Sequence, residues 1–424
     1  MSTNDSTTPA QTPSSPSSPQ SQNALLASQE QQSFSEYITG FFQRIRAGDL
    51  GPLPILVGIV LIIIIFQTAN ANFLSARNFV NLILQMAGTT MIAYGVVFVL
   101  LLGEIDLSVG YVSAIGGVLM TVLVAPPYSY PWYSAVGLAL LAVLVIGLMQ
   151  GLLIIIFQLP SFIVTLAGLL VWSGVVLVIL GEGGTINIEN PLLSNLASSY
   201  LSPELGWILA IVLVVGFAFT QYLDSRRRKS HELNTKPLLI SAVEVIVLAI
   251  VLLTAVAICN ADRGVPVIGA GVILVLIILT YVTQNTRFGR YVYAVGGNKE
   301  AARRAGIRVE RIRVYVFMIS SFMAGLGGII LASRLRSVAS GQGSGDLLLD
   351  CIAAAVIGGT SLFGGRGYVS SAVIGALIIA SVQNGMGLLG LPASIQSIIT
   401  GCVLLMAVIV DSISRRNQKR SGLA

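Results

Sequence analysis

The stretch GEIDLSVG, residues 103–110, places Glu104 and Asp106 two residues apart between two apolar runs. A charged side chain in the middle of a membrane costs about 2.5–3.5 kcal/mol on insertion scales, so such residues usually face a bundle interior or an interface. Asp106 and Ser108 can cap a following helix, because their oxygens accept hydrogen bonds from its first N–H groups. Glycines on either side permit tight backbone geometry. The residues of this predicted turn are Gly103, Glu104, Asp106, Ser108 and Gly110.

Residue types that carry out catalysis are few and scattered. The sole histidine, His231, lies in the basic segment RRRKSHEL, where an imidazole is more typical of a solvated loop than of a ligand set. Cys259, Cys351 and Cys402 lie far apart, in or beside apolar runs, where thiols pack as small hydrophobic groups. The phosphate-binding pattern G-x-x-x-x-G-K-[ST] does not occur. We therefore expect no enzyme activity, no metal site and no cofactor in this chain.

The elements that must position the polar residues are long and apolar. Hydrophobic residues make up 55% of the chain and charged residues 10%, with a mean hydropathy of +0.86, whereas a soluble domain carries about 25% charged residues. Runs such as 53–69 and 239–258 approach the roughly 20 residues with which a helix crosses a bilayer. Continuous rather than alternating apolar runs favour helices over a barrel. The expected fold class is an all-α polytopic transmembrane helical bundle of about 10–12 spans.

Basic residues sort the loops between the predicted spans. If the N-terminus is inside and the sides alternate, all but four of the 24 Lys and Arg residues lie on the inner side, which basic residues favour. We expect both termini to be cytoplasmic and the net charge of +6 to reflect these loops rather than a nucleic-acid partner. The predicted spans are 53–70, 79–102, 107–125, 133–157, 161–181, 205–222, 238–259, 265–284, 314–333, 347–361, 367–388 and 394–411.

The two ends of the chain differ from the middle. Residues 1–50 are rich in Ser, Pro and Gln, so we expect a disordered cytoplasmic tail that is not a signal peptide. Within it, 34–46 could form an amphipathic helix on the membrane surface or a solvated lead-in. Residues 51–415 are the predicted transmembrane domain, and 416–424 a basic cytoplasmic tail.

The predicted cytoplasmic loop 285–313 contains the short helical segment NKEAARRAG. Asn298 can cap the free N–H groups of this helix, Glu300 lies near its positive end, and Gly306 is placed to stop it. A short helix with an alanine face and basic flanks suits a groove in another protein. The alternative is a basic loop that only fixes the topology.

Two segments of the chain are similar to each other. GYVSAIGG at 110–117 is echoed by GYVSSAVIG at 367–375, and each follows a glycine-containing turn. Transporter halves often carry weak repeats with glycine-interrupted spans at matching positions, although small and apolar residues also resemble one another by chance. We predict two pseudo-repeated halves and a second turn that mirrors the first. Its residues are Gly358, Gly359, Thr360, Ser361, Gly364 and Gly365.

Four stretches in order, GEIDLSVG, LPSFIVTLAGLL, YAVGGNKEAARRAGI and IAAAVIGGTSLFGGRG, resemble the permease subunits of bacterial ABC-type sugar importers. The similarity is to the ribose, xylose and galactose group and covers about residues 53–415. The extra basic loop and span at 223–260 most resemble the xylose-type permease. The resemblance implies a type II importer-like permease in the bacterial inner membrane that admits a monosaccharide.

The resemblance also implies three protein partners in addition to the lipid bilayer. An ABC ATPase subunit, which uses ATP and Mg²⁺, would dock on the helix of loop 285–313. A sugar-loaded extracytoplasmic binding protein would reach the outer face, and a second permease copy would complete the path. The ATPase-coupling residues carried over are Asn298, Glu300, Ala301, Ala302, Arg303, Arg304, Ala305 and Gly306.

Polar residues in late or broken spans could line a sugar path, since sugars are usually bound by hydrogen-bonding side chains with an aromatic platform. The alternative for each is hydrogen bonding between helices. For the first turn, a structural role in helix packing and direct sugar contact by its carboxylates both remain open. The candidate path-lining residues are Thr165, Trp172, Ser173, Gln383 and Asn384.

An ion-gradient-driven secondary transporter is the competing function. A proton-coupled carrier would place carboxylates deep in the membrane. The carboxylates of this chain fall near predicted span ends, and a helical basic loop is available for a partner, so the ATP-driven importer is favoured. The carboxylates concerned are Glu104, Asp106, Asp350 and Asp411.

Overall fold

The computed structural model describes most of the predicted transmembrane domain. The predicted tail 1–50, with its candidate surface helix 34–46, lies outside the described residues, and so does the end of the predicted basic tail 416–424. The described residues are 53–181, 184–230 and 237–420.

The described chain forms two compact units. In the smaller unit, residues 211–230 and 237–252, two helix segments are joined by a hydrogen bond of 2.5 Å from Gln221 Nε2 to Glu244 Oε2. The larger unit contains the other described residues, including both predicted turns and the predicted coupling loop.

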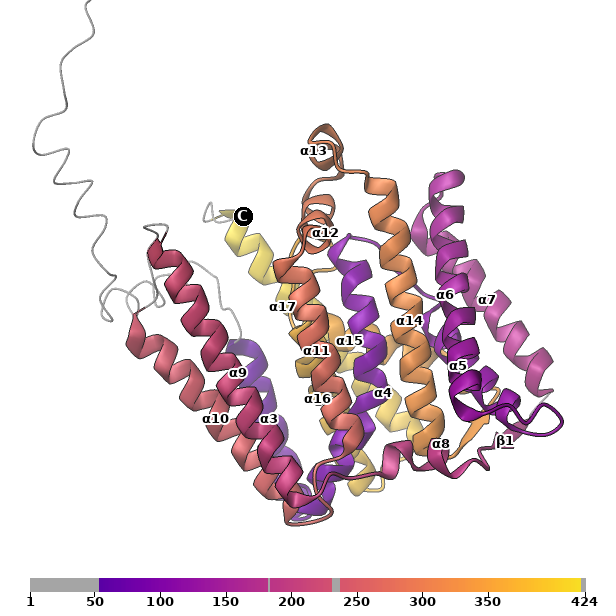
Figure 1. Ribbon diagram of the computed structural model, residues 1–424, viewed down its shortest axis with the longest axis horizontal. Coiled ribbons are helices and arrows are strands. Elements are labelled where there is room, and N and C mark those ends of the chain that lie inside the picture. The colour runs from indigo at the N-terminus through magenta and orange to yellow at the C-terminus, as the bar shows by residue number, and fades with distance from the viewer. Residues whose placement is uncertain (1–52, 182–183, 231–236, 421–424) are drawn as a thin grey trace, which may run out of the picture. The chain divides into compact units, whose positions relative to one another are not determined.

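Long helices dominate the described residues (Figure 1). Each predicted span falls on one helix, and among the described residues eight helices are long and apolar enough to cross a membrane. An apolar run becomes a helix in lipid because its backbone must satisfy its own hydrogen bonds. The predicted polytopic helical fold is therefore confirmed. The helices are α3 (Leu53–Ala69), α4 (Ala76–Leu101), α5 (Val109–Val124), α6 (Trp132–Ile156), α7 (Ser161–Leu180), α9 (Pro203–Ser230), α10 (Leu238–Asn260), α11 (Val267–Asn285), α14 (Val309–Leu335), α15 (Gly345–Ile357), α16 (Ser370–Leu388) and α17 (Ala393–Arg420).

A small sheet departs from the all-α expectation. Strand β1 (Thr185–Asn187) pairs antiparallel with β2 (Ser337–Ala339), with Ile186 opposite Val338. Helix α8 (Pro191–Asn195) and the 3-10 helix η1 (Leu196–Ser198) follow β1. The sheet was not predicted because its strands are only three residues long and are distant in the sequence, so the sequence contains no hairpin pattern that would indicate them.

Helix α14 is the centre of the larger unit, where it packs against α4, α5 and α6. Small residues let these helices approach closely. A Cβ on Gly116 of α5 would lie 2.7 Å from the Cα of Gly325 on α14. A Cβ on Gly147 of α6 would lie 2.6 Å from the carbonyl oxygen of Phe317. At these two helix crossings there is therefore no room for a side chain in place of the glycine.

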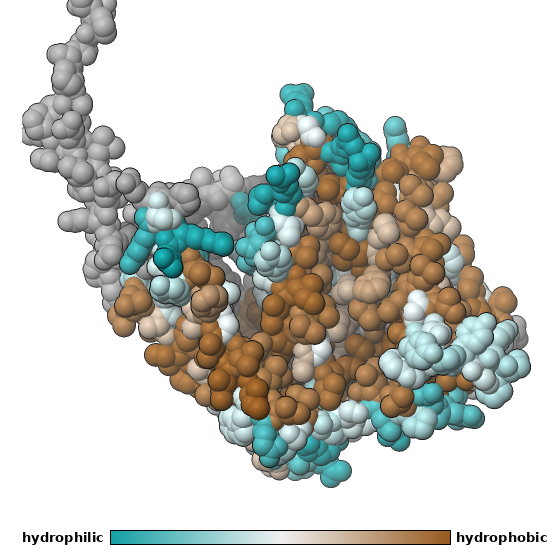
Figure 2. Space-filling view, in the orientation of Figure 1, coloured by the Kyte–Doolittle hydropathy of each residue, from teal (hydrophilic) through white to brown (hydrophobic). Residues whose placement is uncertain are grey.

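The two ends of the larger unit are polar and its middle is apolar (Figure 2). Exposed residues such as Leu274 and Ile278 cover α11, whereas hydrophilic residues gather on α12 (Arg287–Gly297) and α13 (Lys299–Arg304). Below, "the α13 end" is the end that carries α13, and "the β1 end" is the end that carries β1 and α8 (Figure 1). This polar–apolar–polar order is what a bilayer requires.

Both predicted turns lie between paired helices. Residues 102–108 connect α4 to α5, and 358–369 connect α15 to α16. The first of the two similar segments begins at the second residue of α5, and the other begins three residues before α16. The second turn also touches the end of α4, where the first turn begins, because the backbone N–H of Gly365 donates to the carbonyl of Leu101 at 2.9 Å.

Candidate functional site

The predicted coupling loop folds as two consecutive helices, α12 and α13. The side chain of Asn298 accepts a hydrogen bond from Ala301 N at 2.9 Å, so the predicted cap of α13 is confirmed. Gly306 follows the helix with a φ of 83°, a left-handed conformation that suits glycine and ends the helix. Helix α12 was not predicted, although Thr286, whose side chain accepts from Gly289 N, is a capping residue that could have indicated it.

Helix α13 stands at the end of the bundle (Figure 1), and all of its residues except Ala302 are exposed. Ala302 is the residue of α13 that packs inward, at 4% exposure. The remaining predicted coupling residues form an exposed face beside it. They are Asn298, Glu300, Ala301, Arg303, Arg304, Ala305 and Gly306.

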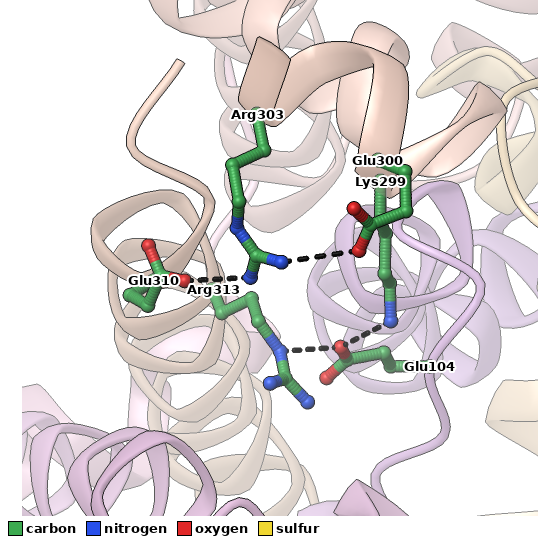
Figure 3. Close-up of polar contacts among 6 residues, drawn as sticks. All are labelled: Glu104, Lys299, Glu300, Arg303, Glu310 and Arg313. Carbon is green, nitrogen blue, oxygen red and sulfur yellow. Dashed lines mark hydrogen bonds and ion pairs between the residues drawn. The ribbon is translucent and has the colours of Figure 1, made fainter. Parts of the chain in front are cut away.

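An inner cluster of charges joins α13 to the first turn (Figure 3). Lys299 Nζ donates to Glu104 Oε1 at 3.0 Å, and the Arg313 guanidinium approaches the same oxygen. The Arg313 contact is an ion pair without hydrogen-bond geometry, because its Nε donates to no described acceptor. The Glu104 side chain is only 3% exposed, against 45% for Lys299 and 18% for Arg313. The inner cluster is therefore a largely buried carboxylate held by two cations.

An outer cluster holds α13 to the start of α14 (Figure 3). Arg303 donates to Glu300 Oε1 at 3.1 Å and to Glu310 Oε1 at 2.8 Å. The hydrogen bond and charge of Glu310, followed by the charge of Glu300, raise the pKa of Arg303 above its usual value. All three side chains are at least half exposed. Water and salt screen such pairs, so the outer cluster orients α13 more than it stabilises the fold.

A tight backbone contact lies beside the inner cluster. The glycine junction, as we call it, consists of Gly103, Gly296, Gly364 and Gly365 around the carbonyl of Leu101. A Cβ on Gly296, at the end of α12, would overlap that carbonyl. Gly103, Gly364 and Gly365 have φ values of 70°, 85° and 73°, which other residues rarely adopt. Three separate segments, α12 and the two turns, therefore meet backbone to backbone.

The first turn continues inward to a buried hydrogen-bond cluster, called here the Asp106 cluster. Asp106 Oδ1 accepts from the backbone N–H of Ser108 at 3.0 Å and from its hydroxyl at 2.6 Å. Asp106 Oδ2 accepts from Ser320 Oγ of α14 at 3.1 Å. Gln150 Nε2 of α6 donates to Ser108 Oγ at 2.9 Å. The turn is thus bonded to two neighbouring helices below the inner cluster.

The expected capping of α5 by Ser108 is wrong. Ser108 is the N-cap residue, but its side chain bonds to Asp106 and Gln150 and to no N–H of α5. Its φ of −86° and ψ of −13° are already helical. A capping side chain needs the extended backbone that lets it fold back over the first turn. Asp106 likewise accepts from Ser108 N rather than from within α5.

The second turn is held by its own contacts. The N–H of Ser361 donates to the carbonyl of Arg366 at 2.9 Å, and Ser361 Oγ accepts from Phe363 N at 3.1 Å. Gly358 lies against the backbone of Ser371, where a Cβ would overlap it. Gly359 has a φ of 106°, and the buried Thr360 Oγ1 has no hydrogen-bond partner among the described residues.

Three candidate path-lining residues lie on α7. Thr165 is buried and donates to Ser161 O at 3.0 Å within its own helix, and Ser173 similarly donates to Leu170 O at 2.8 Å. Trp172 Nε1 is shielded from solvent and has no hydrogen-bond partner among the described residues. It lies near the Asp106 cluster, since a Cβ on Gly168 would be 3.3 Å from this nitrogen and 2.7 Å from Gln150 Nε2.

The other two candidates lie on α16 in different surroundings. Gln383 Nε2 donates to the buried Asp350 at 2.7 Å, and both residues line a cavity of about 160 Å³ between α15, α16 and α17. Asn384 accepts from Asn78 Nδ2 at 2.8 Å and donates to Gln85 at 3.1 Å, so it links α16 to α4. Helix α7 packs against α5 and α6, whereas α16 packs against α15 and α4. The candidates therefore form two groups rather than one pocket.

Sequence reasoning missed Lys299 and Arg313, the two cations of the inner cluster. Both lie in the predicted coupling loop or at its end, but nothing in their spacing points to Glu104, which lies far away in the sequence. The surplus of basic residues in the loop was assigned to topology alone. A carboxylate directly after an apolar run was the available signal, because a charge that is removed from water needs a cation.

The comparisons with known proteins agree with the fold. Residues 78–408 match the family described as "Branched-chain amino acid transport system / permease component". The chain is 38% identical to the xylose transport system permease protein XylH of Escherichia coli K12 over 381 residues, 89% of this chain and 96% of that protein. It is 34% identical to the XylH of Haemophilus influenzae over 375 residues, 88% of this chain and 99% of that one.

A ribose permease is also similar to the chain. The ribose import permease protein RbsC of Bacillus subtilis is 32% identical over 362 residues, 85% of this chain and 92% of that protein. No solved structure gives a significant match. The family's title names amino acids and the relatives' names sugars, so the family fixes the class of transport protein but not its cargo. The chain belongs to this family of transport-system permease components and is an integral membrane protein.

Proposed function

We propose that this chain is the membrane-spanning subunit of an ATP-driven, binding-protein-dependent importer of a monosaccharide, with xylose or a similar pentose as the cargo. The names of the similar proteins support a sugar rather than an amino acid, since four xylose and several ribose permeases match over more than four fifths of the chain. The enzyme chemistry belongs to the partner, an ATPase subunit that binds ATP and Mg²⁺.

The observation that carries the coupling role is the attachment of α13. Its outward face is exposed, and its inner side is tied by Lys299 to the carboxylate of Glu104 in the first turn. A helix that only fixed topology through its charges would need no ion pair with a buried residue. The proposed ATPase contact is the exposed face of α13 defined above, which does not include Lys299, and its Glu300 and Arg304 carry opposite charges.

The proposed orientation places the α13 end and both termini in the cytoplasm of a bacterium, whose inner membrane the chain spans. The distribution of basic residues supports it. The β1 end then faces outward, where an extracytoplasmic binding protein would deliver sugar, and a second copy of the chain would complete the path.

The proposed path lining keeps all five candidates, but their contacts rank them. Trp172 has an unused buried donor, and Gln383 borders a cavity, so these two are best suited to sugar hydroxyls. Thr165 and Ser173 bond within α7, and Asn384 bonds to two residues of α4. For the first turn, the ion pairs of Glu104 and the hydrogen bonds of Asp106 favour a structural role over direct sugar contact.

Uptake into reconstituted vesicles tests the function. Xylose accumulation is expected only when the ATPase subunit, ATP with Mg²⁺ and a xylose-loaded binding protein are all present. Ribose and leucine are the matched cargo controls, each with its own binding protein. Accumulation by this chain alone under a proton gradient would instead establish the ion-driven carrier.

A further inference from the structure

We infer that Glu104 is a positioning residue through which movement of α13 reaches the bundle interior. The inference rests on the proposed function, because the movement is the one that the ATPase subunit would impose. Three features of the larger unit carry it: the inner cluster, the glycine junction and the Asp106 cluster.

The first step is the shared carboxylate oxygen of the inner cluster. Lys299 begins α13 and Arg313 lies in the first turns of α14, yet both contact Glu104 Oε1 (Figure 3). The second oxygen, Oε2, is buried and has no hydrogen-bond partner among the described residues. The carboxylate is thus held at one point by two elements, and a displacement of either cation moves the turn.

Glu104 is charged although its side chain is buried, and this choice of residue supports a coupling role. Removing a carboxylate from water is unfavourable, and apolar residues of similar volume often stabilise a fold as well as a buried ion pair does. Packing alone would not require a charge here. A carboxylate with two cations does provide a link that is specific for α13 and α14, which is what a coupling element needs.

The second step is the rigid backbone contact of the glycine junction beside Glu104. In the glycine junction the end of α12 and both turns touch through backbone atoms, with no side chains between them to absorb a shift. Packed backbones move as bodies rather than deform continuously. When α12 and α13 are displaced together, the first turn is therefore displaced with them.

The third step connects the turn to the helices around it. Two residues beyond Glu104, Asp106 bonds to Ser320 of α14, and through Ser108 to Gln150 of α6. The backbone N–H of Ile105 between them donates to Ser161 Oγ of α7 at 3.5 Å. A continuous series of contacts therefore runs from α13 to α6, α7 and α14, which is the kind of network that carries coupling between sites.

The outer cluster provides the matched comparison. Arg303 also joins α13 to α14, through Glu310, but these side chains are exposed and do not touch the first turn. If any charged tether were sufficient for coupling, the two clusters would matter equally. If movement of α13 reaches the bundle through the first turn, loss of the inner cluster should reduce coupling far more than loss of the outer cluster.

The test compares Glu104→Gln, Lys299→Gln, the double variant and Glu310→Gln in the complete transporter. For each, ATPase co-purification, ATP hydrolysis and xylose uptake are measured. We expect the Glu104→Gln and Lys299→Gln proteins to retain the ATPase subunit and to hydrolyse ATP. The amount of xylose transported per ATP should fall by a factor of about 5 to 150, the range of factors to which typical coupling free energies correspond. The double variant should be no worse than Glu104→Gln alone, because Glu104→Gln already removes the ion pair that Lys299→Gln removes. Glu310→Gln should have the smallest effect.

Wild-type transport per ATP in the Glu104→Gln or Lys299→Gln protein would overturn the inference, as would losses that add in the double variant. If Glu104→Gln fails to reach the membrane, Lys299→Gln decides, because Lys299 is half exposed and its loss leaves Arg313 on Glu104. Failure of the wild-type chain to bind an ATPase subunit would instead refute the proposed function. The two failures are therefore distinguishable.

Discussion

Gly365 donates its backbone N–H to the carbonyl of Leu101 at 2.9 Å, and this bond joins the second turn to the end of α4, where the first turn begins, although the two segments are distant in the sequence. The end of α12 packs against the same carbonyl through Gly296. The loop that we propose for ATPase docking therefore reaches both predicted half-repeats at one place.

The glycine junction should not tolerate a methyl group at Gly296. Gly296→Ala drives a Cβ into Leu101 O and Gly365 N, backbone atoms that cannot swing aside, and overpacking typically costs about 1–3 kcal/mol. Gly297→Ala is the control, because its Cβ would meet nothing within 4 Å. Thermal unfolding in detergent should show a lower Tm for the first variant alone. Equal Tm values would mean that the junction adjusts freely.

Asp106→Ala should lower folded yield together with transport. The change leaves the buried hydroxyl of Ser320 and the N–H of Ser108 without their acceptor, and an unsatisfied buried group costs about 1–3 kcal/mol. Asp106→Asn, which keeps an acceptor oxygen, should recover part of the yield. The folded yield is measured as the amount of permease in the membrane. A normal level with a selectively changed sugar preference would favour direct sugar contact.

Asn298→Ala should weaken ATPase binding without reducing the amount of permease in the membrane. The N-cap bond to Ala301 N is lost, and such a loss costs about 0.5–2 kcal/mol of helix stability. Asn298→Asp keeps an acceptor and should bind the ATPase normally. Co-purification measures the effect. Full binding by the alanine variant would show that a formed α13 is not needed for docking.

Arg304→Cys should be labelled by an impermeant thiol reagent in inside-out vesicles and not in intact cells. Arg304 is exposed on α13, the end proposed to be cytoplasmic. The background is Cys402→Ser, because Cys402 is exposed while Cys259 and Cys351 are buried. Tyr128→Cys, exposed between α5 and α6, should give the opposite pattern. Labelling of Arg304→Cys in intact cells would invert the orientation and remove the ATPase role of α13.

Gln383→Ala and Asn384→Ala should behave differently although they are neighbours. Gln383 borders the cavity and donates to Asp350, so its loss should lower xylose uptake per folded protein as well as Tm, because the buried Asp350 loses its hydrogen-bond donor. Asn384 bonds to Asn78 and Gln85, and interhelical bonds of this kind contribute about 0.6–2 kcal/mol. The loss of Asn384 should lower Tm and leave xylose uptake per folded protein unchanged. Uptake and unfolding measured on both proteins separate the roles, and identical profiles would contradict the division.

The sequence by itself determined the features that depend on near neighbours. Hydropathy over about 20 residues located the spans, because a helix in lipid satisfies its hydrogen bonds internally. Asn298 and Gly306 marked the ends of α13, since a cap acts within one helical turn. The capping expectation for Ser108 failed because its side chain bonds to Gln150 of another helix instead.

Only the tertiary structure decided which distant residues meet. The pairing of Glu104 with Lys299 and Arg313, the contact of Gly365 with Leu101 and the pairing of β1 with β2 all join segments far apart in the chain. Spacing rules describe a single helix or strand and carry no information about its neighbours. Charge and backbone contacts between helices depend on how the bundle packs, and for this reason the partners of Glu104 could not be read from its surroundings in the sequence.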